Sequence, residues 1–140
     1  MQKLANSSVA DNHPPQCVVL TFPKTLDQYQ AVGQIEKNLK KINDRLGTSY
    51  GLFDYYGAPD AERVIVAMGS VSGTAREAVA YLNAQGEKVG YLQVHLFNPF
   101  STEYFLKSLP TTVKKIAVLD RCKEMGAVGD PLYLTVCAAY

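Results

Sequence analysis

The stretch VIVAMGSVSGTAREAVAYL, residues 64–82, begins as an apolar run and ends with the spacing of a helix. Residues 64–67 are all apolar, which is typical of a strand covered on both faces in a parallel sheet. After a glycine-rich turn at residues 69–74, apolar side chains recur at steps of three and four. These side chains belong to Ala75, Ala78, Val79 and Leu82. A strand that turns directly into a helix predicts an α/β fold.

The same alternation continues to the last residue. We expect strands at 63–68, 88–97 and 114–120, and helices at 74–85, 101–109 and 132–140. Thr74 and Glu77 could form a capping box, Ser101 could cap the second of these helices, and Gly86 could end the first. Because crossovers between parallel strands are right-handed, the pattern predicts three layers, with a mostly parallel sheet and helices on both faces.

An amphipathic helix is predicted before this region. Apolar residues from Leu26 to Leu46 fall on one helical face, with Thr25 as a candidate cap and Gly47 as the residue that ends the helix. The aromatic cluster at 50–56 could stack a base or a cofactor, although packing is the more common role of such rings. We interpret residues 1–24 as irregular, 25–60 as a helix and aromatic connector that end a preceding domain, and 61–140 as a truncated α/β domain.

The composition excludes several classes of function. Of the 140 residues, 47% are hydrophobic and 19% charged, and the formal net charge is +1, which gives no reason to expect a nucleic acid or an acidic membrane as partner. No signal peptide or membrane span is evident, so we expect a cytoplasmic protein. The chain has an odd number of cysteines, and their spacing matches no zinc or iron–sulfur ligand pattern. We therefore expect Cys17, Cys122 and Cys137 to be free thiols that are buried or half-buried.

The glycine-rich turn at 69–74 departs from the phosphate-binding signatures. Thr74 stands where the P-loop needs lysine, and Val71 stands where the dinucleotide-binding pattern needs its second glycine. An anion on the helix N-terminus is therefore the minor alternative. We expect a packing turn, in which glycine lets the helix approach the sheet closely.

Two alternatives assign the sheet an independent role. In a free-standing enzyme or nucleotide-binding protein, ligands would meet the carboxyl ends of the strands. The candidate residues there are Ser70, Ser72, Asp120, Arg121, Lys123 and Glu124. No histidine is placed to activate Ser70, because His13 lies in the irregular start and His95 is a predicted strand residue. The second alternative is an interaction module that binds another subunit through an open sheet edge.

Three segments together resemble one domain of the pyruvate:ferredoxin (flavodoxin) oxidoreductase family. They are LFDYYGAPDAERVIVAMGS (52–70), GEKVGYLQVHLFNPFS (86–101) and LPTTVKKIAVLDRCKEMGAVGDPLY (109–133). Each is weak alone, but their order and spacing are specific, and the resemblance covers most of the chain. It implies the family's transketolase C-terminal-like domain, and hence a fragment of a much longer enzyme.

The resemblance also implies a chemistry for the whole enzyme. Members are large homodimers that oxidise pyruvate to acetyl-CoA with thiamine diphosphate, Mg²⁺ and [4Fe–4S] clusters, with CoA as substrate and ferredoxin or flavodoxin as electron acceptor. They work in the cytoplasm or in anaerobic organelles such as hydrogenosomes. The resembled domain is a structural, interdomain element, so we expect no catalytic, cofactor-binding or metal-binding residues in this chain, and no activity of the chain alone.

Four positions depart from the family pattern. His95 and Asn98 stand where arginines are expected near the end of a strand, and Cys122 and Met125 stand where the last loop usually has threonine and proline. If those arginines make interdomain salt bridges, an imidazole or an amide there weakens the contact.

Overall fold

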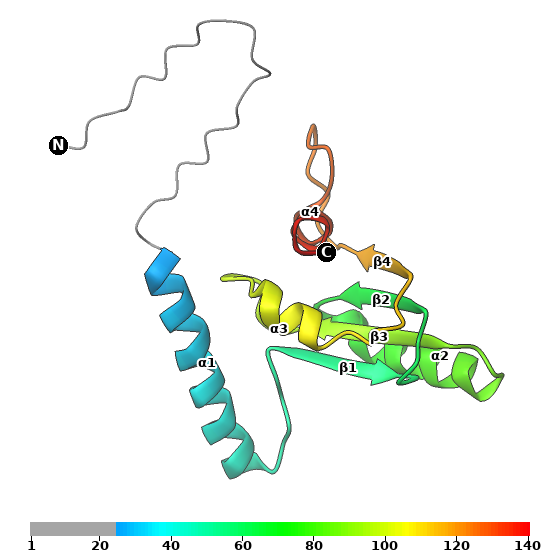
Figure 1. Ribbon diagram of the computed structural model, residues 1–140, viewed down its shortest axis with the longest axis horizontal. Helices are drawn as coiled ribbons and strands as arrows, with labels where there is room; N and C mark the ends of the chain where they lie inside the picture. The colour runs from blue at the N-terminus through cyan, green and yellow to red at the C-terminus, as the bar shows by residue number, and fades with distance from the viewer. Residues whose placement is uncertain (1–24) are drawn as a thin grey trace, which may run out of the picture.

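The computed structural model describes residues 25–140 (Figure 1). The segment 1–24, with His13 and Cys17, lies outside the described residues, as does the side chain of the proposed cap Thr25. The elements in chain order are α1 (Thr25–Leu46), β1 (Phe53–Gly57), β2 (Arg63–Ala67), the 3₁₀ turn η1 (Gly69–Val71), α2 (Ser72–Ala84), β3 (Val89–Val94), α3 (Thr102–Lys107), β4 (Lys115–Leu119) and α4 (Pro131–Ala139).

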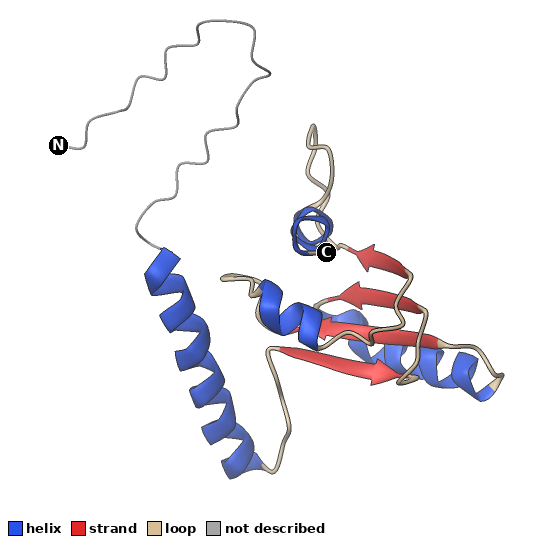
Figure 2. Ribbon diagram, in the orientation of Figure 1, coloured by secondary structure: helices blue, strands red, loops and turns tan. Residues whose placement is uncertain are grey.

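The strands form one mixed sheet in the order β1-β3-β2-β4 (Figure 2). The three predicted strands are parallel: β2 pairs with β3 on one side and with β4 on the other, so that Val64 lies opposite both Gly90 and Ile116. Helices cover both faces of the sheet. The predicted α/β architecture, with a mostly parallel sheet preceded by a helix, is confirmed.

The aromatic stretch expected to be a connector forms the edge strand β1, which runs antiparallel to β3. Its side chains alternate between the two faces of the sheet. Phe53 packs in the core with Phe105, and the Tyr56 ring on the opposite face stacks on Tyr91 with centroids 6.3 Å apart. The sequence hides this alternation because tyrosines, which have both apolar and polar atoms, occupy both faces.

The two faces of the sheet are covered unequally. Helices α1, α3 and α4 pack on one face, over a core that includes Val32, Phe105 and Leu132. On the other face α2 lies mainly over β3 and β1, where Ala75 and Val79 meet the sheet. The side chains of β4 on that same face, namely Lys115, Ala117 and Leu119, are exposed.

The helix ends show that one predicted cap is wrong and that two predicted glycine ends are correct. Helix α2 begins at Ser72, so Thr74 lies inside it and the predicted capping box is wrong. The reason is the turn η1, which continues directly into the helix, as the Ser72 N–H donates to the Gly69 carbonyl. Gly47 and Gly86 end their helices with positive φ, as expected. Ser101 occupies the N-cap of α3 but makes no side-chain capping bond.

Candidate functional site

The carboxyl ends of β2, β3 and β4 meet at one edge of the sheet, where the chain leaves β2 for α2 on one face and leaves β4 for α4 on the other. Such a switch point is where α/β sheets commonly bind ligands or partners. The structure brings two predicted residues together there: Arg121 Nη1 donates a hydrogen bond to Ser70 Oγ at 3.1 Å.

Three other candidates from the same loop serve its structure. Asp120 does not pair with Arg121; its Oδ2 accepts a hydrogen bond from the Tyr133 N–H at 3.0 Å, in the first turn of α4. The Glu124 N–H donates to Asp130 Oδ1 at 3.0 Å, and Lys123 Nζ lies 3.9 Å from Asp130 Oδ2. These contacts hold the loop in its shape.

The sixth candidate, Ser72, belongs to a polar cluster between α2 and the sheet. Ser72 Oγ and Arg76 Nη2 each lie 2.6 Å from Gln93 Oε1, to which both donate. The Arg76 guanidinium also lies over the Tyr56 ring, 3.6 Å from its centroid. Below them Tyr91 is fully buried, and this burial raises the pKa of its hydroxyl. Sequence reasoning missed Arg76 and Gln93, although strand alternation puts Gln93 on the face that α2 covers.

His95 lies just beyond β3 and not within it. Its Nε2 is 3.0 Å from Asp54 Oδ2, and the Tyr50 ring lies edge-on to the imidazole at 5.7 Å. Asp54 Oδ1 also accepts the Gly51 N–H at 2.8 Å. His95 thus joins the end of β3 to the start of β1. The hydrogen-bond partner of Ser70 among the described residues is Arg121 and not a histidine.

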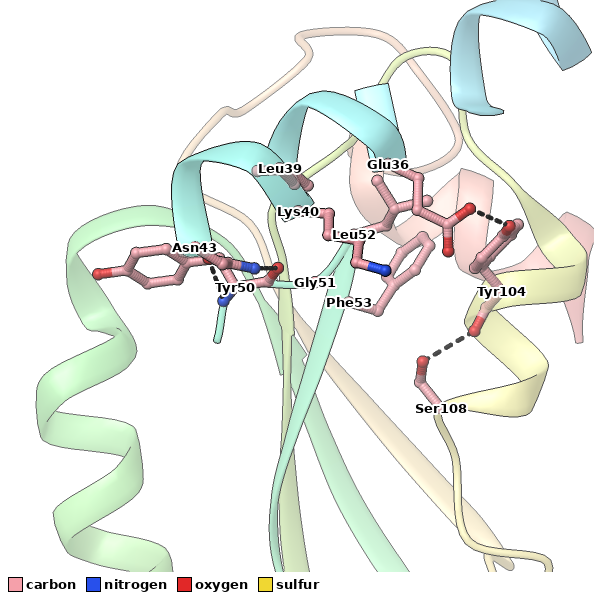
Figure 3. Close-up of a pocket in the computed structure, with 10 residues that line it drawn as sticks. All are labelled: Glu36, Leu39, Lys40, Asn43, Tyr50, Gly51, Leu52, Phe53, Tyr104 and Ser108. Atoms are coloured by element: carbon pink, nitrogen blue, oxygen red, sulfur yellow. Dashed lines mark hydrogen bonds between the residues drawn. The ribbon is translucent and has the colours of Figure 1, made fainter. Parts of the chain in front are cut away.

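A cavity of about 300 Å³ lies between α1, β1 and α3 (Figure 3). Its polar groups mostly bond to one another. Tyr104 Oη donates to Glu36 at 2.7 Å, which raises the pKa of Tyr104, and Ser108 Oγ donates to the Tyr104 carbonyl at 2.8 Å. Asn43 binds both the N–H and the carbonyl of Tyr50. The cavity therefore belongs to the packing interface between α1, β1 and α3, which we call the α1 seam.

Metal ligands do not converge anywhere in the described residues. Within 25–140, no three His, Cys, Asp or Glu side chains come close enough to hold an ion. Cys122 and Cys137 are free thiols, as predicted, but both are exposed, whereas buried or half-buried thiols were expected. Over the same residues, none of the helices has both the length and the apolar character needed to cross a membrane.

Gly69 provides a first testable prediction. The prediction that glycine is needed here to let the helix approach the sheet closely is wrong, because a Cβ built at Gly69 meets no atom within 4 Å. The backbone φ at this residue is +80°. The residue is needed for its backbone conformation. Gly69→Val is expected to lower the free energy of unfolding by about 1–3 kcal/mol in urea denaturation, because a β-branched residue is strained at positive φ.

The matched variant is Gly69→Asn, since asparagine tolerates the left-handed region. It should recover most of the stability that valine loses. Equal losses for the two variants would show that space, and not backbone conformation, limits this position.

Comparison with known proteins gives a consistent set of relatives. Residues 61–140 match the family model for pyruvate:ferredoxin oxidoreductase core domain II. The chain is 56% identical over 106 residues to a pyruvate-flavodoxin oxidoreductase of Enterobacter agglomerans, covering 76% of this chain and 9% of that protein. It is 56% identical over 113 residues to one of Klebsiella pneumoniae (80% and 10%), and 55% identical over 101 residues to a pyruvate:ferredoxin oxidoreductase of Moorella thermoacetica (72% and 9%).

A solved structure, the 2-oxoglutarate:ferredoxin oxidoreductase from Magnetococcus marinus with 2-oxoglutarate, coenzyme A and succinyl-CoA bound, shares the fold. The TM-score is 0.52 at 24% identity, over 79% of this chain and 18% of that one. The chain spans about a tenth of the length of the curated relatives given above.

Proposed function

This chain belongs to the pyruvate:ferredoxin oxidoreductase family, matching its core domain II, and we propose that it acts as a structural, interdomain part of an enzyme that oxidises pyruvate to acetyl-CoA. The electrons would pass to ferredoxin or flavodoxin, the acceptors that the names of the relatives give. The other domains of the same polypeptide and a second subunit would be its permanent partners. Helix α1 would connect this domain to the one before it.

The cofactors of the whole enzyme do not fit the described residues. Thiamine diphosphate with Mg²⁺, and [4Fe–4S] clusters, need converging oxygen or thiolate ligands. Here Cys122 lies in the β4–α4 loop and Cys137 in α4, and no third ligand joins them among residues 25–140. We therefore place these groups in other parts of the enzyme, and we propose the same for the main CoA site.

The uncovered face of β4 is the observation that supports an interdomain role. Parallel strands are normally covered on both faces. Strand β4 instead forms one edge of the sheet and exposes Ala117 and Leu119 on the side of α2, with Leu119 48% exposed. Lys115 stands at the start of this face, and the two apolar side chains that follow it fit against another folded surface better than against water.

A chimera tests this role. In the Klebsiella pneumoniae relative, the segment of 113 aligned residues is replaced by the matching residues of this chain. Pyruvate-dependent flavodoxin reduction should be retained. Leu119→Lys in the chimera should lower it by about tenfold or more, because a charge buried in an apolar interface costs several kcal/mol.

The control is Tyr81→Lys, at a site on α2 that is 64% exposed and away from β4. It should leave flavodoxin reduction unchanged. A chimera that folds but reduces no flavodoxin contradicts the proposed function, and equal activities of the two lysine variants contradict docking through β4.

A further inference from the structure

The loop between β4 and α4, residues 120–130, is the longest connection in the described part of the chain and projects from the body of the domain (Figure 1). Two apolar side chains lie at its tip. Met125 is 91% exposed and Val128 is 95% exposed, more than any other large apolar residue that the structure describes. No other element among residues 25–140 covers them.

The tip is braced from within. The side chain of Asp130 closes the loop by accepting the Glu124 N–H, and it also lies near the Lys123 ammonium group. Across the tip, the Ala127 N–H donates to the Glu124 carbonyl at 3.2 Å, and Gly126 takes the positive φ of +86° that this turn requires. A loop that is already held in one shape loses little conformational entropy on binding.

Charge separates the tip from its base. The base carries five charged residues, whereas residues 125–129 carry no charge; the five are Asp120, Arg121, Lys123, Glu124 and Asp130. Transient redox partners typically meet through small, polar contacts, while permanent interfaces have apolar centres. The chemistry of the tip therefore fits a permanent apolar contact better than an electron carrier that comes and goes.

We propose that this loop inserts Met125 and Val128 into an apolar pocket on another part of the same oxidoreductase polypeptide. The proposal rests on the proposed function. We assign the pocket to the same polypeptide because the relatives are about ten times longer than this chain, so that most of their surface lies outside the part that matches it. The β4–α4 loop would then fix the position of the sheet edge at which Ser70 and Arg121 lie.

The test places the photo-crosslinker p-benzoylphenylalanine at position 125 of the chimera described above, and at position 81 as the exposed control. Position 125 should crosslink efficiently to an apolar peptide outside the exchanged segment and within one chain, without doubling the mass on a denaturing gel. Position 81 should crosslink at least about tenfold less, because water surrounds it.

A crosslink from position 125 only to flavodoxin, to the second subunit or to the exchanged segment itself overturns the proposal, as does none at all. Crosslinking is read on the purified, folded chimera whether or not it is active. An active chimera without the crosslink therefore contradicts the loop proposal alone, and an inactive chimera with the crosslink contradicts the proposed function alone.

Discussion

Gly57→Ala is expected to lower the free energy of unfolding of this chain by about 3–5 kcal/mol, which is the combined cost of backbone strain and of overpacking. Gly57 ends β1 with φ of +130°, a conformation that residues with a Cβ rarely adopt. A Cβ there would lie 2.5 Å from the Val89 carbonyl oxygen and 2.7 Å from Gly90 Cα. Both are backbone atoms of β3, so relief requires moving the strand and not merely a side chain.

Urea denaturation of the 140-residue chain measures the loss. The matched control is Gly73→Ala in α2, where φ is ordinary and a built Cβ meets nothing within 4 Å. The control should be neutral or slightly stabilising, because alanine favours a helix over glycine. Equal midpoints for the two variants would contradict the packing of β1 against β3 described above.

Most of the sheet could be predicted because β2, one of its two inner strands, has a clear apolar pattern. Residues 64–67 are apolar without a break, which is typical of a strand buried on both faces, and the helical spacing that follows sets the direction of the crossover. The same topology correctly predicts that Ser70 and Arg121 share one edge of the sheet. Strand β1 was missed because its tyrosines give no clear alternation.

The contacts within the candidate site could be predicted less well, since they depend on which atoms meet after the chain has folded. The sequence shows Asp120 beside Arg121, yet the carboxylate turns to the first turn of α4 and the guanidinium to Ser70. Likewise, the pairing of His95 with Asp54 depends on the register between β1 and β3, which cannot be predicted without knowing that β1 exists.

Phe105→Ala is expected to cost about 3–5 kcal/mol of stability, the usual range for truncating a buried phenylalanine. Phe105 is fully buried, and its ring packs against Phe53 at 5.8 Å and Phe100 at 5.3 Å between centroids. Helix α3 has six residues, too few to be stable through its own hydrogen bonds. The aromatic contacts are therefore what holds α3 on the sheet.

The neighbouring variant Leu106→Ala separates this effect from a loss of helix propensity. Leu106 lies on the same helix but is 43% exposed, so its truncation should cost roughly 1 kcal/mol or less. Thermal denaturation of both variants checks the difference, and similar melting temperatures would show that α3 is held in some other way. Because α3 also supplies Tyr104 to the α1 seam, and Ser108 follows directly after the helix, the Phe105 variant should loosen α1 as well. Hydrogen exchange should then be faster in α1 for Phe105→Ala than for Leu106→Ala, since only the first removes the support on which that seam depends.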